Sequence, residues 1–418
     1  MSTAMPLDVS AIRDQYPALA GGAVFFDNPG GTQVPQSVLD AVLGTLRDSN
    51  ANLGGAFATS RAADDSVEAA RAAVADLLGA QTPGEVVFGA NMTTLTFALA
   101  RALGRRLGPG DELVVTRLDH DANIAPWLTV AEDRGCVVRW LDFDPSDCTL
   151  RLDQLDDVLG SRTRLVALGW ASNAVGTVNP VHRIVERAKS VGALTFIDAV
   201  QLAPHRLVDV QALGCDFLAA SAYKFFGPHV GALWGRYELL DELVPYKVRP
   251  ASDEPPGSFE TGTLNHEGIA GAGAAVDYLA DLSSLPRSAP RRRRLEQAFE
   301  TMCAYESRLG RQLIEVLEST PGVRVYGLTT AERDADRVPT VAFTMAGRTP
   351  REVAAALGER RIHVWDGHYY ALEVVRRLGL DQSGGMVRVG LAHYNTAEEV
   401  ARLGEALQAI ASARAAGG

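Results

Sequence analysis

The sequence predicts an α/β fold in which a mostly parallel sheet is covered by helices on both faces. Two observations support this. Seven short runs of β-branched and other apolar residues alternate with amphipathic helical segments between about residues 65 and 236, a pattern typical of βαβ units. These runs are apolar along most of their length, as expected of strands that are buried on both faces. A seven-stranded sheet is therefore expected in a large domain.

The expected strands follow from these runs and from the turn residues between them. They cover residues 85–90, 112–119, 136–143, 164–172, 194–200, 216–222 and 231–235. Helices are expected between them, for example over 66–79 and 179–192. Residues 251–268 are rich in turn-forming residues and are expected to form a long functional loop.

The pattern changes after residue 285, where a long helix over about 288–319 begins. Short strands and helices follow it, which predicts a small α+β domain. We therefore expect an N-terminal arm over 1–25, a large domain over 26–285 and a small C-terminal domain over 286–418. The N-terminal segment is a candidate contributor to the small domain. The four arginines at 291–294 are expected on a solvated face of the long helix.

Composition excludes several classes of function. The 418 residues carry a net charge of −11, which argues against a nucleic-acid partner. The four cysteines are scattered without the spacing of a zinc site or a disulfide framework, so we expect no metal and a reducing cytoplasm. No signal peptide and no membrane span are expected.

One lysine lies in an unusual setting. In "SAYKFFGPHVGALWGR" Lys224 stands between two aromatic residues just after an expected strand, and in "FIDAVQ" Asp198 ends another. The carboxyl ends of parallel strands meet at one crevice, so both side chains are expected there. Pyridoxal 5′-phosphate needs such a pair, a lysine for its aldehyde and an acid for its ring nitrogen. A buried Asp–Lys ion pair is the alternative.

Other features fit the same cofactor. Asn91, Met92 and Thr93 start an apolar helix after a strand, and a helix N-terminus binds phosphate well. Ordinary N-capping by Thr93 or Thr94 is the alternative. His120 follows another strand, where its ring would stack on a flat cofactor or would simply belong to a loop.

Several motifs together resemble a known family. They are "FFDNPGGTQVP", "NMTTLTFALA", "DHDANIAPW", "ASNAVGTVNP", "FIDAVQ", "SAYKFFGP", "FETGTLNHEG" and "VRVGLAHYNTAEEV". In this order they resemble the fold-type I pyridoxal-phosphate enzymes of the class V aminotransferase group, in the cysteine desulfurase-like branch. The resemblance runs through nearly the whole chain and implies the pyridoxal-phosphate-dependent transferase fold, with pyridoxal 5′-phosphate as cofactor.

The resemblance also implies a role for each matching residue. The implied catalytic residues are Lys224, Asp198 and His120. The implied cofactor-binding residues are Met92, Thr93, His120, Asn173, Asp198, Gln201, Ser221, Tyr223, Lys224 and Thr263. The implied substrate-binding residues are Arg388, Gly30, Gly31, Asn173, His368 and Tyr370.

Within this set, Arg388 is expected to hold the substrate carboxylate, for which a bidentate guanidinium is suited. A surface arginine on an edge strand is its alternative, and a simple turn is the alternative for Gly30 and Gly31. Thr263 resembles the residue that reaches the phosphate in the neighbouring subunit, which implies a homodimer. Tyr223 replaces a histidine that is usual beside the lysine.

The chain departs from the family pattern in one loop. Cysteine desulfurases carry a nucleophilic cysteine before the carboxylate-binding arginine, but residues 363–388 contain none. Tyr370 stands in its place, and a phenol does not accept sulfur as a thiolate does. Trp365 stands where the family often has a second arginine. Together with His368 and Tyr369, these residues either shape a pocket for a larger amino acid or pack a lid, and both interpretations stay open.

These observations predict a pyridoxal-phosphate enzyme that acts on an L-α-amino acid. The preferred reaction is β-elimination from cysteine or an S-substituted cysteine, without persulfide transfer. Transamination is the alternative, followed by epimerisation and by decarboxylation coupled to oxidative deamination. A non-enzymatic sensor is disfavoured, because no helix-turn-helix segment flanks the fold and Arg388 is retained.

Overall fold

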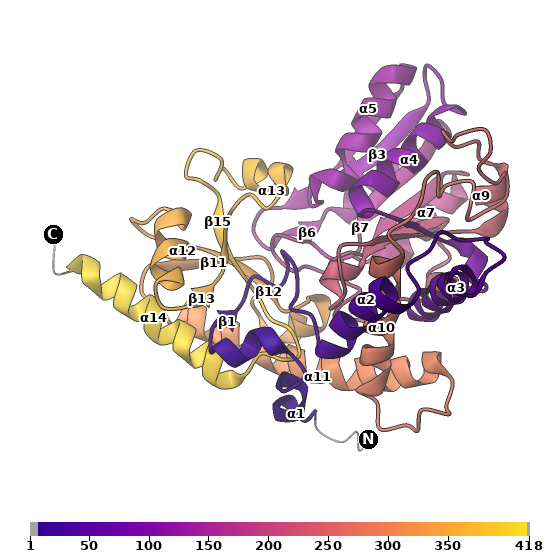
Figure 1. Ribbon diagram of the computed structural model, residues 1–418. Helices are drawn as coiled ribbons and strands as arrows, with labels where there is room; N and C mark the ends of the chain where they lie inside the picture. The colour runs from indigo at the N-terminus through magenta and orange to yellow at the C-terminus, as the bar shows by residue number, and fades with distance from the viewer. Residues whose placement is uncertain (1–6, 416–418) are drawn as a thin grey trace.

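A seven-stranded sheet forms the centre of the chain in the computed structural model, which describes residues 7–415 (Figure 1). The strand order is β2-β10-β9-β8-β7-β3-β4. Only β10 runs against the others, since it pairs antiparallel with β9 and β2 while the remaining pairs are parallel. The strands are β2 (Val86–Gly89), β3 (Glu112–Thr116), β4 (Val137–Leu141), β7 (Thr163–Gly169), β8 (Leu194–Asp198), β9 (Phe217–Ser221) and β10 (Gly231–Gly235). The predicted mostly parallel sheet is confirmed.

Helices cover both faces of this sheet, and alternate residues of each strand pack into different cores. In β3, Leu113 and Val115 belong to the core beneath α4 and α5, whereas Val114 belongs to the core beneath α3, α7 and α10. This explains why the strands are apolar throughout. The helices of this part are α2 (Gln36–Asp48), α3 (Ala58–Leu78), α4 (Met92–Gly104), α5 (Ala125–Arg134), α6 (Leu155–Val158), α7 (Val181–Ser190), α8 (Val210–Leu213), α9 (Tyr237–Glu242) and α10 (His266–Asp281).

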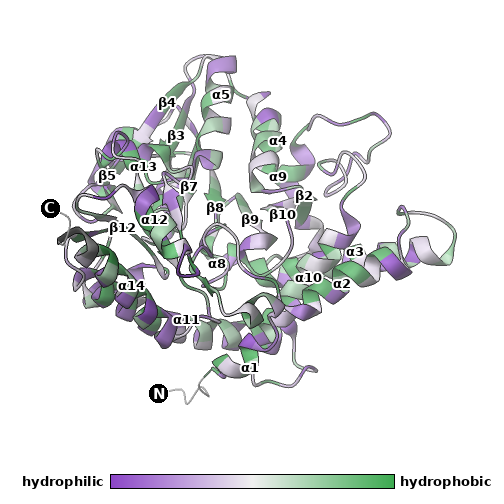
Figure 2. Cartoon of the chain, turned by 60° about the vertical axis from the view of Figure 1, so that its left-hand side comes forward, coloured by the Kyte–Doolittle hydropathy of each residue, from purple (hydrophilic) through white to green (hydrophobic). Residues whose placement is uncertain are grey.

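A second, four-stranded antiparallel sheet lies in the C-terminal part, in the order β11-β12-β15-β14. Its strands are β11 (Val323–Tyr326), β12 (Thr340–Met345), β14 (Trp365–Gly367) and β15 (Met386–Gly390). Its helices are α11 (Arg291–Glu318), α12 (Pro350–Gly358), α13 (Leu372–Arg377) and α14 (Ala397–Ala415). Figure 2 shows hydrophobic and hydrophilic residues mixed along α11 and α14, as in helices that bury one face.

Short elements complete the chain. Two-residue strands β5 (Phe143–Asp144) and β6 (Thr149–Leu150) form a hairpin after β4. Near the N-terminus, α1 (Val9–Arg13) precedes β1 (Val24–Phe25), which pairs in parallel with β13 (Ile362–His363). The expected domain boundaries at 25 and 285 stay predictions, and residues 1–6 and 416–418 of the outer segments lie outside the described residues. No helix within 7–415 is long and apolar enough to cross a membrane.

The four arginines at the start of α11 differ from the expected solvated face. Only Arg293 is largely exposed. Arg294 is buried and pairs with Asp281, and Arg291 pairs with Asp76 and Asp277. The expectation was wrong for three of the four positions. These arginines pair with acidic residues on neighbouring helices, and the sequence alone does not show which helices are neighbours.

The expected loop over 251–268 ends earlier than predicted, because α10 begins at His266, and the remaining loop is held by a buried ion pair. Arg71 Nη1 lies 2.7 Å from Glu260 Oε1, and both side chains are less than a tenth exposed. The same carboxylate oxygen accepts a hydrogen bond from the Phe88 backbone N–H at 2.7 Å. Glu260 therefore ties the loop to α3 and to the edge strand β2.

Glu260→Gln should lower the free energy of unfolding by about 3 kcal/mol, because the Arg71 guanidinium would remain buried without a countercharge. Urea denaturation followed by circular dichroism measures this. Glu242→Gln is the control, since the Glu242 side chain is 60% exposed, and it should change the free energy by no more than about 0.5 kcal/mol. Equal losses in both variants would contradict the proposed anchor.

Candidate active site

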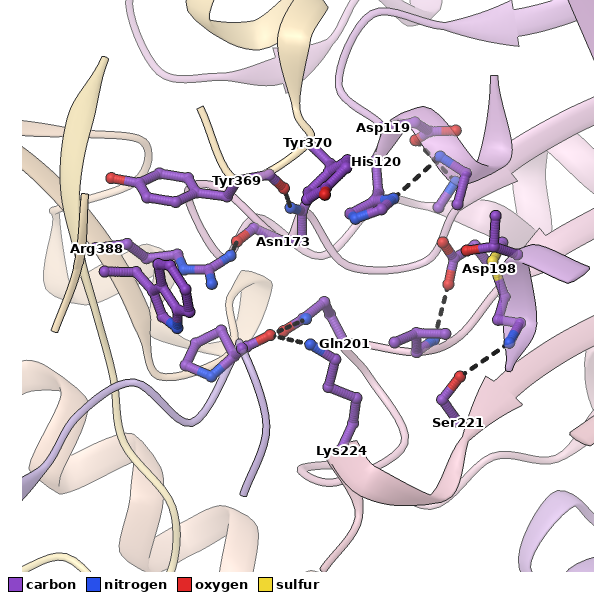
Figure 3. Close-up of a pocket in the computed structure, with 18 of the residues that line it drawn as sticks. Asp119, His120, Asn173, Asp198, Gln201, Ser221, Lys224, Tyr369, Tyr370 and Arg388 are labelled. Carbon is purple, nitrogen blue, oxygen red and sulfur yellow. Dashed lines mark hydrogen bonds between the residues drawn. The ribbon is translucent and has the colours of Figure 1, made fainter. Parts of the chain in front are cut away.

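A cavity of about 390 Å³ lies at the carboxyl ends of the parallel strands, where the lid residues and β15 close over it (Figure 3). Residues next to the seven-stranded sheet and residues of the four-stranded sheet line the cavity together, although they are far apart in the sequence. They are Pro29, Gly30, Asn91, Met92, Thr93, Asp119, His120, Ala122, Gly169, Ala171, Asn173, Asp198, Val200, Gln201, Ser221, Tyr223, Lys224, Trp365, Asp366, Gly367, His368, Tyr369, Tyr370 and Arg388.

Lys224 is positioned by the turn that follows β9. A short 3-10 helix over Ala222–Lys224 brings its side chain into the cavity, where it is 8% exposed. Its Nζ donates a hydrogen bond to the Pro29 carbonyl oxygen. Burial, together with the positive charge of Arg388, lowers the pKa of Lys224 to about 7, against the opposing effect of Asp198. Near neutral pH much of this lysine is therefore a neutral, nucleophilic amine.

Two buried carboxylates lie on the far side of the cavity. Asp198 ends β8, and its Oδ1 accepts a hydrogen bond from the Val200 backbone N–H at 2.9 Å. Burial raises the pKa of Asp198 to about 6, against the effects of this bond and of Lys224. Asp119 also lines the cavity and accepts hydrogen bonds from Gly169 N–H and Asn123 Nδ2, both at 2.9 Å. Burial raises its pKa to about 7.

The sequence analysis missed Asp119. The signal was present, since Asp119 lies just beyond the end of β3 and Asp198 is the last residue of β8, and the same rule about strand ends applies to both.

The N-terminus of α4 faces the cavity next to β9. Asn91 caps the helix by accepting a hydrogen bond from the Thr94 N–H at 2.9 Å, so the alternative of N-capping by Thr93 or Thr94 was wrong. The Met92 N–H donates to Ser221 Oγ at 3.2 Å, and Thr93 lines the cavity. Backbone N–H groups and hydroxyls thus gather where an anion would be stabilised.

His120 presents a flat and uncharged ring. Its Nδ1 accepts a hydrogen bond from the Ala122 N–H at 3.0 Å, which assigns the proton to Nε2. Burial lowers the pKa of His120 to about 3, and Lys224 and Arg388 lower it as well. The ring stacks on Tyr370 with centroids 5.4 Å apart and planes inclined by 19°.

Arg388 is held from two sides. Its guanidinium donates to the Asn173 carbonyl oxygen at 2.7 Å and lies 4.4 Å from the centre of the Tyr369 ring. Strand β15 runs between β12 and β14, and Arg388 is 4% exposed, so the alternative of a surface arginine on an edge strand was wrong. Asn173 Nδ2 in turn donates to the Tyr369 carbonyl oxygen at 2.8 Å.

The remaining expected residues divide into two groups. Gln201 lies in the cavity and donates to the Pro29 carbonyl oxygen at 2.9 Å. Gly30 also lines it, and a Cβ there would come within 2.4 Å of Trp365 Nε1, so any other residue at this position would displace the indole. Gly31 instead lies against Tyr223, and Thr263 is exposed; the cavity of this chain includes neither residue.

The lid over the cavity is fixed by its backbone. Tyr369 and Tyr370 both have positive φ angles, 51° and 59°, which non-glycine residues rarely adopt. The Tyr370 carbonyl oxygen accepts a hydrogen bond from the Asp121 N–H at 2.7 Å, next to His120. The hydroxyl of Tyr369 donates to the Met386 carbonyl oxygen. Such strain persists where the surroundings determine it, which is common at functional sites.

The donor set fits pyridoxal 5′-phosphate. Lys224 would join its aldehyde, Asp198 would face its ring nitrogen, and the α4 N-terminus with Ser221 would hold its phosphate. Two buried polar atoms in the cavity, Asn173 Oδ1 and Arg388 Nε, have no protein partner in the described structure. A bound hydroxyl would donate to Asn173 Oδ1, and a bound carboxylate would accept from Arg388 Nε, so a ligand that carries both groups would satisfy both atoms.

The pKa of Lys224 gives a testable pH dependence. In cofactor-free enzyme, the rate at which Lys224 joins added pyridoxal phosphate should rise with pH and level off above about pH 7, instead of near 10.5 as for an ordinary lysine, because only the neutral amine attacks. Stopped-flow absorbance measures this. In Arg388→Ala the midpoint should move to higher pH, since the Arg388 charge lowers the Lys224 pKa. A midpoint near 10 in the unmodified chain would contradict the assignment.

Comparisons with known proteins agree with this geometry. Residues 24–403 match the family model for class V aminotransferases. The chain is 36% identical over 416 residues to the aminotransferase-like protein FGM3 of Gibberella zeae, covering 96% of this chain and 98% of that protein. It is 33% identical over 426 residues to a cysteine desulfurase of Serratia proteamaculans, covering 97% and 99%. It spans only 57% of the probable cysteine desulfurase of Mycolicibacterium paratuberculosis, to which it is 35% identical.

Solved structures are also similar. The apo cysteine desulfurase of Thermococcus onnurineus superimposes with a TM-score of 0.87 at 28% identity, covering 98% of this chain and 99% of that one. The C-DES mutant with glycine covalently linked to pyridoxal phosphate, at 22% identity and a TM-score of 0.78, shares the fold.

Proposed function

The chain belongs to the class V aminotransferase family and is a pyridoxal-phosphate-dependent enzyme of fold type I, and from this premise we propose that it catalyses β-elimination on an L-α-amino acid. Its reaction would be C–S lysis of cysteine or an S-substituted cysteine, without transfer of sulfur to the protein. The observation that carries this proposal is that Tyr370, which stands where the family resemblance places the acceptor cysteine, lines the cavity.

The cysteines support the absence of an acceptor. None of the four lines the cavity, and Cys148 and Cys215 are buried elsewhere. Burial raises the pKa of all four thiols, which keeps them protonated and poorly nucleophilic. A cytoplasmic location, in keeping with these unpaired thiols, is part of the proposal.

Each side chain has a place in this reaction. Bound pyridoxal phosphate would supply the electron sink for the charge that develops at Cα. Arg388 binds the α-carboxylate with its guanidinium, and Lys224, as a neutral amine, removes the Cα proton. Asp198 would pair with the cofactor ring nitrogen, and the neutral His120 ring would lie against the bound cofactor. The Cβ–S bond then breaks with its electron pair on sulfur, and water completes the conversion to keto acid, ammonia and thiol.

Product analysis tests this proposal. The holoenzyme is incubated with L-cysteine and S-substituted L-cysteines without added keto acid. Pyruvate, ammonia and thiol are expected in equal amounts over many turnovers. A single turnover that yields pyridoxamine phosphate, and resumes only when a keto acid is added, would contradict elimination and make the chain an aminotransferase.

We further propose a homodimer in which Thr263 completes the partner's phosphate site. Thr263 is exposed on the loop after Glu260 and does not line the cavity of its own chain. Leu39, Leu43 and Leu46 expose apolar side chains along α2, an arrangement that favours burial against another surface. Sedimentation equilibrium should give twice the 44.6 kDa chain mass. A monomer that retains full turnover would contradict this.

A further inference from the structure

The two lid tyrosines, Tyr369 and Tyr370, have different environments. One of them packs the lid, and the other is placed to shape a pocket for a larger amino acid. Tyr369 packs the lid, since its hydroxyl donates to the Met386 carbonyl oxygen and its ring lies under the Arg388 guanidinium. Tyr370 is 67% exposed and its ring lies in the cavity against His120. Figure 3 shows Tyr370 between His120 and Tyr369, on the Arg388 side of the cavity and away from Ser221. Tyr370 therefore faces the region where a substrate side chain would extend.

Trp365 lies across the same region. It is paired with Arg388 in the register of β14 and β15, which places both side chains on one face of the sheet. The indole lines the cavity, is half exposed, and approaches Gly30 so closely that a Cβ at this position would meet it. Gly30 thus leaves room for a large flat side chain beside the carboxylate-binding arginine.

The charges in the cavity limit what this region can bind. Among the described residues that line it, Lys224 and Arg388 are the only lysine and arginine. In the proposed function Lys224 serves the cofactor and Arg388 the α-carboxylate, so no guanidinium or ammonium group remains for a second carboxylate. Asp366 lies in the lid and pairs outward with Arg351 at 3.1 Å. A substrate with an anionic side chain would lie beside Trp365 and Tyr370 with no lysine or arginine to pair with its charge.

We propose that the site selects amino acids with one carboxylate and an uncharged, flat or apolar substituent, which lies against Trp365 and Tyr370. This inference rests on the proposed function, because that function assigns Arg388 and Lys224. In C–S lysis the preferred substrates are cysteine thioethers with aromatic or apolar groups on sulfur. Amino acids with a second carboxylate are excluded.

The test compares S-benzyl-L-cysteine with S-carboxymethyl-L-cysteine on the holoenzyme. The kcat/KM for the benzyl compound should be at least about tenfold higher, because one substituent contacts two rings and the other is an unpaired anion. Equal or reversed values would overturn the inference.

Binding is measured separately, by the change in cofactor absorption with L-phenylalanine and L-aspartate. Tighter binding of L-phenylalanine, even without elimination, would uphold the inference while the proposed function fails. Equal binding of both amino acids would count against the inference.

Variants identify the residues responsible. Trp365→Ala and Tyr370→Ala should each reduce the benzyl-to-carboxymethyl ratio by about fivefold, whereas Tyr370→Phe keeps the ring and the ratio. Trp365→Arg should strengthen L-aspartate binding by about tenfold, since a guanidinium then faces the second carboxylate. Tyr237→Ala, at an exposed tyrosine outside the cavity, is the control and should leave the ratio unchanged. Unchanged ratios in all the lid variants would overturn the assignment.

Discussion

Lys224→Ala should reduce turnover by roughly 10³-fold or more, because it removes both the amine that joins the cofactor and the base that takes the Cα proton. The structure supports both roles, since Lys224 is buried in the cavity and its pKa is lowered to about 7. The variant should still fold, because the Nζ that is lost with Lys224 makes one hydrogen bond, to the Pro29 carbonyl oxygen. Turnover and the absorption of the covalently bound cofactor are the measurements.

The chain offers a matched control, since it contains only three lysines, Lys189, Lys224 and Lys247. Lys189 is exposed on α7, and Lys189→Ala should leave turnover unchanged. Borohydride reduction followed by peptide mass analysis should place the cofactor on the Lys224 peptide alone. Cofactor on either other lysine, or turnover by Lys224→Ala near that of the unmodified chain, would contradict the assignment.

Arg388→Lys should raise KM by roughly 100-fold with a smaller change in kcat, because an ammonium group cannot bind a carboxylate in the bidentate way of a guanidinium. The Tyr369 ring and the Asn173 carbonyl oxygen hold the guanidinium in place, and a lysine would lose this alignment. Steady-state kinetics measure the change, and spectral titration with a non-reacting amino acid measures binding alone. Arg360→Lys at an exposed position is the control. An unchanged KM in Arg388→Lys would show that the carboxylate binds elsewhere.

The central sheet could be predicted from the sequence because each strand is buried on both faces and is apolar throughout. All seven expected strands lie in one sheet. Six of the seven were predicted to end too late, for example at 119 instead of Thr116 and at 200 instead of Asp198. Some of the residues in between, such as Asp119 and Val200, leave the sheet and line the cavity, and the residue types at the strand ends do not mark where pairing stops.

Parts of the site could not be predicted in the same way. The Pro29 carbonyl oxygen receives hydrogen bonds from Lys224 and Gln201, and the sequence carries no signal for a backbone acceptor. The different environments of Tyr369 and Tyr370 depend on positive φ angles at both of these adjacent residues. Nothing in an aromatic residue type predicts a positive φ angle. Asp119, by contrast, lies like Asp198 at the carboxyl end of a parallel strand, and its place in the cavity could have been predicted from the sequence.

The fate of sulfur from L-cysteine tests the central claim most directly. The holoenzyme is allowed to turn over L-cysteine without added thiol, and the intact protein mass, alanine and pyruvate are measured together. Elimination predicts an unchanged protein mass, free sulfide and pyruvate, because Tyr370 cannot accept sulfur and no cysteine lines the described cavity. A protein that gains sulfur while alanine forms would show persulfide transfer and would contradict the account.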